Sequence, residues 1–202
     1  MIYRTYIKHI FDWLVAFSLG ILLFPFFICI VLLLLITQGK EVFFTQMRSG
    51  KNLEEFRLYK FRTLQPSYSD DLSISNRQYT FVGKFMRSFG IDELPQLLNI
   101  LKGNMSFIGP RPMPVEYVGE YNEQQLARFD VKPGITGWAQ VHGRNKISWI
   151  SRFELDFWYI HHISLSVDLK ICWLTLIQLI NSIFGYYKKE PAMQVFKRSN
   201  AT

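Results

Sequence analysis

Cysteine is almost absent from this 202-residue sequence, in which Cys29 and Cys172 are the only two. Two cysteines are too few for a disulfide framework, and Cys29 lies inside an apolar run. They give no sign of an oxidising compartment. Histidine is scarce as well. The adjacent His161 and His162 direct their rings apart, and no Cys or His spacing indicates a zinc site.

Familiar nucleotide-binding loops are also missing, because neither a Walker A loop nor a GxGxxG turn occurs. Charge of one sign is in excess: 23 Lys and Arg stand against 16 Asp and Glu, a formal net charge of +7. This excess favours an anionic partner such as nucleic acid, anionic lipid or a phosphorylated substrate. The basic residues form no block that could follow a nucleic-acid backbone, so we expect no nucleic-acid partner.

A long apolar run stands near the N-terminus. Residues Trp13 to Ile36 include no charged side chain. As one helix they would extend about 36 Å, enough to cross a hydrocarbon core of about 30 Å. A signal peptide is disfavoured because its apolar core would be shorter and would precede small cleavage-site residues. We interpret the run as a permanent membrane segment.

The path of this segment through the bilayer has two interpretations. Pro25 lies in the middle of the run and predicts a kink. Basic residues flank both ends, with Arg4 and Lys8 before the run and Lys40 and Arg48 after it. Because such residues favour the cytoplasmic side, a re-entrant hairpin satisfies both ends better than a crossing. A kinked spanning helix is the alternative, since prolines also occur in spanning helices.

Two short strands are predicted after the membrane segment. Val42–Met47 and Phe56–Thr63 carry β-forming residues around a polar turn at residues 49–52. In the second strand, side-chain alternation places Lys60 and Arg62 on one face. Two cations side by side indicate an anion opposite them or, alternatively, a solvated strand face.

The most informative stretch is residues 87–112. Asp92 and Glu93 stand directly before a short apolar helix, whose buried face is predicted to hold Leu94, Leu97, Leu98 and Leu101. Amide groups at a helix start attract anions. Arg87 lies just upstream, and Arg111 stands between Pro110 and Pro112. The combination predicts a site for a phosphate and a divalent cation. Alternatively Asp92 is only a helix cap, although a cap requires neither a second carboxylate nor a rigidly held arginine.

Two further helices are expected downstream. Residues 115–129 are typical of a surface helix. Leu169–Tyr187 is apolar but interrupted by Lys170, Gln178 and Asn181, which favours a helix lying in the membrane interface.

Taken together, these segments resemble the monotopic phosphoglycosyl transferases, bacterial sugar transferases that begin glycan assembly on a polyprenyl carrier. The resemblance runs from Tyr3 to about Phe184. It rests on these motifs in the same order: Lys8…Asp12, Lys60-Phe61-Arg62-Thr63, Asp92-Glu93-Leu94-Pro95-Gln96, Ser106-Phe107-Ile108-Gly109-Pro110-Arg111-Pro112, Pro133-Gly134-Ile135-Thr136-Gly137, Gly143-Arg144-Asn145 and Asp168-Leu169-Lys170.

The resemblance implies an activity. A sugar 1-phosphate moves from a UDP-sugar, in short members often an acetamido sugar, to undecaprenyl phosphate, and UMP is released. Asp92 would be the nucleophile that forms a covalent phosphosugar intermediate, and Glu93 would bind Mg²⁺. Arg111 would lie in the nucleotide and phosphate site. This is the first membrane step of glycan, O-antigen, capsule or exopolysaccharide assembly.

Other residues are expected to contact substrate or lipid head groups: Lys8, Lys60, Arg62, Arg87, Pro110, Pro112 and Arg144. The family implies a membrane helix that enters and leaves one leaflet, bent at Pro25. Members usually have Ser before that proline and Arg after the lysine, where this chain has Phe24 and His9.

The expected fold is α/β, mostly α with a small β-hairpin. Residues 1–38 would form the re-entrant membrane helix, 39–187 a cytoplasmic catalytic domain with interfacial amphipathic helices, and 188–202 a polar tail. The expected location is the cytoplasmic face of the bacterial inner membrane, in contact with membrane lipid, and a homodimer is left open. Two alternatives remain: a glycosyltransferase that acts on a lipid acceptor and releases UDP, and a non-catalytic membrane-anchored scaffold.

Overall fold

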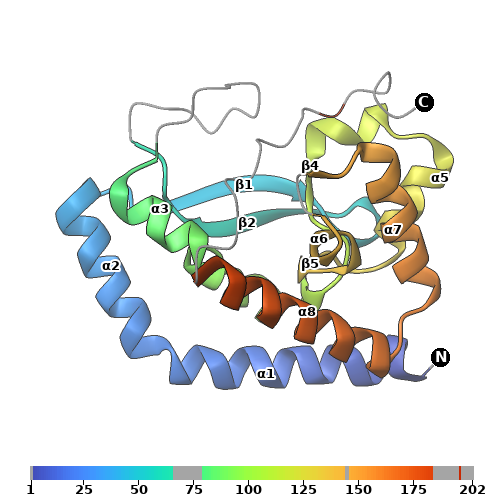
Figure 1. Cartoon of the computed structure of the whole chain (residues 1–202), viewed down its shortest axis with the longest axis horizontal. Helices are drawn as coiled ribbons and strands as arrows, with labels where there is room; N and C mark the ends of the chain where they lie inside the picture. Colours follow the sequence, from blue (N-terminus) through green and yellow to red (C-terminus); the bar gives the residue numbers. More distant parts are fainter. Residues whose placement is uncertain (1, 66–78, 144–145, 184–195, 197–202) are drawn as a thin grey trace.

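The computed structural model describes residues 2–65, 79–143, 146–183 and Phe196. The described part is mostly helical with two small sheets, which confirms the predicted fold class. Figure 1 shows the two N-terminal helices at the periphery of a compact body, one along its lower edge and the other rising on its left side. Arg144, residues 66–78 of the polar stretch before Phe81, and the predicted tail apart from Phe196 lie outside the described residues.

The membrane segment forms two helices rather than one. A π-helical turn, η1 (Tyr3–Ile7), leads into α1 (Lys8–Leu22), and α2 (Phe24–Gln38) follows after Leu23. Pro25 lies in the first turn of α2, where its missing N–H costs little. The predicted kink is therefore confirmed, with the helices separating two residues before the proline (Figure 1).

Both ends of this helix pair dock on the compact body. Near the first end, the Lys8 ammonium pairs with Asp168 at 2.8 Å. At the other end, the Gln38 amide donates to the Thr80 hydroxyl at 3.1 Å. A straight helix over residues 8–38 would separate its ends by about 45 Å. The bend and the two attachments agree with a monotopic arrangement.

Apolar side chains cover the outer surfaces of these helices. Tyr3–Leu22 and Leu165–Ser182 are long and apolar enough to cross a membrane by length and composition. Large exposed apolar residues of α1 and α2 include Phe11, Phe17, Leu22, Phe24, Leu32 and Ile36. Their inner faces are buried instead: Ala16 packs with Phe56 and Leu58, while Leu34 packs with Phe61.

The predicted hairpin is confirmed. Strands β1 (Phe43–Ser49) and β2 (Glu55–Phe61) pair antiparallel, joined by a 3₁₀ turn, η2 (Lys51–Leu53). The short strand β4 (Met113–Pro114) pairs with the C-terminal end of β1, giving the order β2-β1-β4.

A buried amide joins the next elements to the hairpin. Helix α3 (Phe81–Ser88), the 3₁₀ helix η3 (Ile91–Gln96) and α4 (Leu97–Leu101) follow the hairpin. The fully buried Asn99 of α4 donates to the Arg57 carbonyl at 2.7 Å and accepts from the Tyr59 amide at 3.2 Å. It therefore satisfies backbone groups on β2, a strand whose other edge pairs with β1.

A second, parallel sheet consists of β3 (Ser106–Ile108) and β5 (Gly134–Thr136). Its strands approach closely through glycines. A Cβ atom at Gly134 would lie 2.1 Å from the Gly109 nitrogen, and a Cβ at Gly137 would lie 2.1 Å from the Gly109 carbonyl oxygen. Only glycine fits there.

The prediction of one surface helix over residues 115–129 is wrong. The chain instead forms η4 (Val115–Glu120), α5 (Glu123–Leu126) and η5 (Ala127–Asp130). The break has a local cause, because Asn122 and Gln125 form a capping box that starts a new helix. Buried aromatic residues hold this segment against the body: Tyr117, Tyr121, Phe129, Trp149 and Phe196.

Three helices complete the described fold: α6 (Trp138–Val141), α7 (Trp149–His161) and α8 (Leu165–Ile183). The inner side of α8 places the buried Asp168, Ile171 and Gln178 against the body. Its exposed apolar residues are Leu165, Leu169, Trp173, Leu176 and Ile180. Their spacing of three and four puts them on one face, as expected of a helix at a membrane surface.

We predict that Gly134→Ala destabilises the fold by about 1–3 kcal/mol, because the new methyl group overpacks against the Gly109 backbone. Thermal unfolding in detergent measures the effect. Gly119→Ala is the matched control, since no other part of the described chain lies within 4 Å of a Cβ built there. Equal melting temperatures for the two variants would contradict the close β3–β5 approach.

Candidate active site

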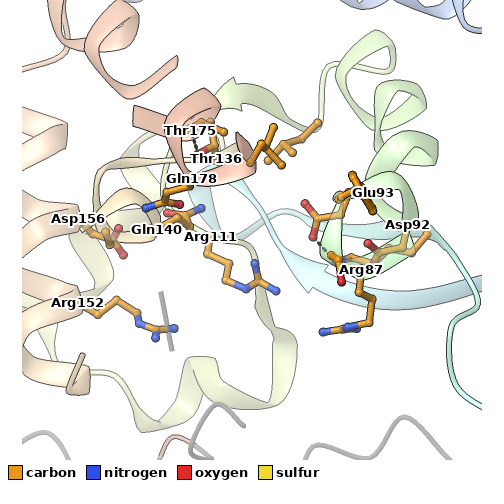
Figure 2. A pocket seen from close by; sticks show the side chains of 17 residues that line it. Arg87, Asp92, Glu93, Arg111, Thr136, Gln140, Arg152, Asp156, Thr175 and Gln178 are labelled. Carbon is orange, nitrogen blue, oxygen red and sulfur yellow. Dashed lines mark hydrogen bonds and ion pairs between the residues drawn. The ribbon is translucent and has the colours of Figure 1, made fainter. Parts of the chain in front are cut away.

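A cavity of about 290 Å³ lies between the helix that carries Asp92 and Glu93 and the helices of the C-terminal half. Figure 2 shows the two carboxylates and Arg87 on one side, Arg152 and Asp156 on the other, and Arg111 between them. The main polar residues of its lining are Lys60, Arg87, Asp92, Glu93, Arg111, Thr136, Gln140, Arg152, Asp156, Thr175 and Gln178. The cavity brings together the predicted residues Asp92, Glu93, Lys60, Arg87 and Arg111.

Asp92 and Glu93 lie in the first turn of η3. Gly90 precedes this turn with φ of +68°, a left-handed conformation that glycine adopts without strain. A 3₁₀ helix has about three residues per turn, so neighbouring side chains diverge by about 120° rather than the 100° of an α-helix. The two carboxylates therefore point in different directions and can contact different groups.

The apolar face predicted for this stretch is partly wrong. Leu98 is 48% exposed, whereas Asp92, Gln96 and Asn99 are buried. Because this stretch begins as a 3₁₀ helix, with fewer residues per turn than an α-helix, different side chains face the interior. The buried residues are 92, 95, 96, 99 and 100. As a result, the nucleophile candidate shares its face with the residue that binds β2.

Glu93 is held as an anion. Lys60 on β2 pairs with its Oε1 atom at 2.5 Å. Burial by itself would raise the pKa of Glu93, but the charges of Lys60, Arg111 and Arg87 outweigh it and lower the pKa to about 2. Glu93 thus carries a full negative charge at neutral pH.

Asp92 lies in a less favourable environment for charge. Only 5% of the residue is exposed. Burial raises the pKa of Asp92, and the Glu93 carboxylate adds to the effect, while Lys60 and Arg87 oppose it. A poorly solvated carboxylate flanked by cations is suited to react with an electron-poor centre.

The two carboxylates also fit a metal ion that binds together with a phosphate-containing substrate. Among the described residues, no three His, Cys, Asp or Glu side chains form a ready-made metal cage. Mg²⁺ is commonly held by one or two carboxylates together with substrate phosphates and water. The ionised Glu93, with Asp92 beside it, meets that requirement.

The backbone of Arg111 is held from two directions. Arg128 donates to the Arg111 carbonyl at 3.0 Å, and Arg48 donates to the Pro112 carbonyl at 3.2 Å. Pro110 and Pro112 are buried, so they shape the backbone rather than line the cavity. The half-buried Arg111 side chain projects into the cavity (Figure 2).

Two polar residues of the opposite wall, Gln140 and Arg152, were not among the sequence candidates. Arg152 and Asp156 come from α7, and Gln140 from α6. Burial, followed by the charge of Arg111, lowers the pKa of Arg152 to about 10. Arg152 and Asp156 are four residues apart on one helix face, a signal that could have indicated this wall.

Two predicted basic contact residues of the described part, Arg62 and Lys8, do not line this cavity either. Arg62 pairs with Glu41 at 2.7 Å. Lys8 pairs with Asp168 and lines a separate pocket. Arg144 lies outside the described residues.

Comparison with known proteins identifies a family. The protein-family model described as "Bacterial sugar transferase" matches residues 3–182 of the chain. The chain is 48% identical over 146 residues to "Uncharacterized sugar transferase EpsL" of Bacillus subtilis, covering 71% of this chain and 72% of that protein.

Two other relatives carry named activities. The chain is 35% identical over 184 residues to the UDP-glucose:undecaprenyl-phosphate glucose-1-phosphate transferase of Escherichia coli, covering 85% of this chain and 40% of that protein. It is 37% identical over 191 residues to the UDP-N-acetylgalactosamine-undecaprenyl-phosphate N-acetylgalactosaminephosphotransferase of Aeromonas hydrophila, covering 90% and 45%. The chain therefore spans less than half the length of these two relatives.

We predict that Arg128→Met costs about 3–5 kcal/mol of stability, because it leaves the Asp156 carboxylate buried without the guanidinium that lies 3.0 Å away. The free energy of unfolding, from denaturant titration in detergent, measures this loss. The double variant Arg128→Met/Asp156→Leu is the control, and it should recover most of the loss because it removes both buried charges. A single variant as stable as the wild type would contradict the prediction.

Proposed function

The chain belongs to the bacterial sugar transferase family, and we propose that it transfers a sugar 1-phosphate from a UDP-sugar to undecaprenyl phosphate. The products are undecaprenyl-diphosphate-sugar and UMP, which makes the enzyme a phosphotransferase of the 2.7.8 class. The observation that carries the proposal is the cavity in which Asp92 and Glu93 meet Lys60, Arg87 and Arg111. The names of the Escherichia coli and Aeromonas hydrophila relatives point to the same reaction type.

Asp92 acts as the nucleophile of the first displacement. One oxygen of its carboxylate bonds to the phosphorus that carries the sugar. The bond from that phosphorus to the bridging oxygen breaks, and UMP leaves with the electron pair. The protein is thereby left with a covalent aspartyl-phosphosugar.

Undecaprenyl phosphate completes the transfer. One of its phosphate oxygens attacks the same phosphorus, the bond to Asp92 breaks, and the free carboxylate returns. Splitting the reaction into two displacements makes each step easier than a direct transfer between two anions.

Charge neutralisation makes such an attack feasible. Arg111 and Arg87 project into the cavity and would bind the diphosphate oxygens, while Lys60 keeps Glu93 ionised. Glu93 would hold Mg²⁺, which would supply positive charge that stabilises the phosphates of the donor. Preformed cations of this kind stabilise charge that shifts during phosphoryl transfer.

The membrane helices explain how the two substrates meet. The acceptor is a lipid, whereas the donor is a water-soluble nucleotide. We assign residues 1–38 to a re-entrant membrane helix, 39–187 to the catalytic domain and 188–202 to a tail, at the cytoplasmic face of the bacterial inner membrane. The exposed apolar residues of α1, α2 and α8 support contact with a membrane.

The sugar is proposed to be an acetamido sugar, and the product to enter glycan, capsule or exopolysaccharide assembly. Relatives are named for glucose and for N-acetylgalactosamine. A panel of UDP-sugars, with UMP release as the readout, would identify the donor.

We predict that Asp92→Asn lowers UMP release by about 10⁴-fold or more, because an amide cannot serve as the nucleophile. The variant should also give no labelled protein adduct with a UDP-sugar whose β-phosphate is radioactive. Both assays use the full chain in detergent with undecaprenyl phosphate.

The exposed Asp130→Asn is the matched control and should retain full activity. An Asp92→Asn variant that turns over at the wild-type rate would exclude covalent catalysis by this residue and favour the scaffold alternative. Release of UDP instead of UMP would favour the lipid-acceptor glycosyltransferase.

A second prediction concerns the metal. Glu93→Gln should raise the Mg²⁺ concentration for half-maximal UMP release by at least about tenfold, since losing even an indirect metal partner has effects of that size. A magnesium titration at saturating substrate measures the shift. An unchanged half-maximal concentration would show that Glu93 is no metal ligand.

A further inference from the structure

A second pocket, of about 130 Å³, lies away from the catalytic cavity, at the N-terminal end of the membrane helices. It shares no lining residue with the first cavity. Its volume is small compared with the roughly 300–1,000 Å³ of pockets that hold whole small molecules. A group the size of a single phosphate fits it better than a sugar nucleotide does.

Positive charge dominates the walls of this pocket. The lining includes Arg4, Lys8, His9, Lys51 and Lys132. Lys8 is neutralised by Asp168 at 2.8 Å. Among the described residues that line the pocket, Asp130 is the single acidic side chain, so Arg4, Lys51 and Lys132 leave an excess of cations.

The cations Arg4, Lys51 and Lys132 come from distant parts of the chain. Arg4 lies on η1, Lys51 on η2, and Lys132 just after η5, which packs against η2. Within the described residues, no ion pair to a carboxylate involves Lys51 or Lys132. Burial lowers the pKa of Lys132, and the Lys51 ammonium lowers it further, although Asp12 acts in the opposite direction. A bound anion would relieve this repulsion.

The position of the pocket selects the kind of anion. Residues 4, 5, 8 and 9 form its helical wall, whereas Tyr6, Ile7, Ile10 and Phe11 are exposed on the rest of the same helix. A helix is about 10 Å across, comparable with the depth of the head-group layer. With its apolar side in the hydrocarbon, the helix holds the pocket at the level of lipid phosphates.

We propose that this pocket binds the phosphate of an anionic membrane lipid and thereby fixes the depth and rotation of the N-terminal helix. Arg4, Lys51 and Lys132 are the contacting cations. The proposal does not depend on the chemistry of the catalytic cavity.

The test compares ligands on the full chain in a non-ionic detergent. Short-chain phosphatidylglycerol, phosphatidylcholine with the same acyl chains, and sodium phosphate are titrated while the melting temperature is followed by tryptophan fluorescence. Only phosphatidylglycerol should raise the melting temperature, because a ligand that binds the folded state stabilises it. Equal stabilisation by phosphatidylcholine would overturn the proposal. Equal stabilisation by sodium phosphate would assign the pocket to free phosphate rather than to a lipid.

The variant Lys51→Gln/Lys132→Gln should bind phosphatidylglycerol about thirtyfold more weakly, given the typical contribution of each basic residue at an anionic surface. The control Lys40→Gln/Arg57→Gln removes the same charge from exposed positions outside the pocket and should bind as the wild type does. Equal weakening in both variants would indicate that the lipid is attracted by the overall positive charge of the protein, and it would overturn the proposal of a specific site.

The charge-conserving variant Lys51→Arg/Lys132→Arg should retain binding, which separates loss of charge from misfolding. UMP release in detergent should be unchanged in Lys51→Gln/Lys132→Gln. Failure of this proposal is therefore distinguishable from failure of the proposed function.

Discussion

The geometry of the catalytic end depends on one buried amide. Asn99 pairs with the backbone of β2 at Arg57 and Tyr59 and so aligns the helix that carries Asp92 and Glu93 with that strand. Lys60, the next residue on β2, then reaches Glu93. Because Asn99 is fully buried, any shift of this helix would leave hydrogen-bonding groups without partners, which is costly. A local packing requirement thus fixes the spacing between the two carboxylates and their cation.

The surrounding charges make this region unfavourable until a substrate arrives. Burial, reinforced by Arg111, lowers the pKa values of Arg48 and Arg152 to about 10. Guanidinium groups that repel one another in a poorly solvated place would gain from the phosphates of a nucleotide sugar. The Asp156 carboxylate, which pairs with Arg128, offsets part of the repulsion at Arg152. The fold therefore maintains electrostatic strain where negative charge is to be bound.

Much of this arrangement could be predicted from the sequence. The helix break near Pro25, the hairpin and the grouping of Asp92, Glu93 and Arg111 follow from local patterns and adjacent motifs. Gln140 and Arg152 of the opposite wall were not predicted. The spacing of Arg152 and Asp156 indicates a shared helix face, but nothing local shows that α7 turns this face toward the cavity. The predicted burial of Leu98 was wrong because the stretch begins with a 3₁₀ turn instead of an α-helical turn. Contact of this segment with β2 favours the 3₁₀ turn, and the local sequence does not show that contact.

Lys8 and Asp168 have a consequence for biosynthesis. Their ion pair is buried, and the Tyr3 and Tyr159 hydroxyls also donate to the same carboxylate. The two partners are 160 residues apart, so the first helix is synthesised long before the helix that neutralises its lysine. Until the ribosome has delivered α8, that ammonium must remain hydrated or bound to a lipid phosphate. Final anchoring of the N-terminal segment is thereby tied to the synthesis of α8.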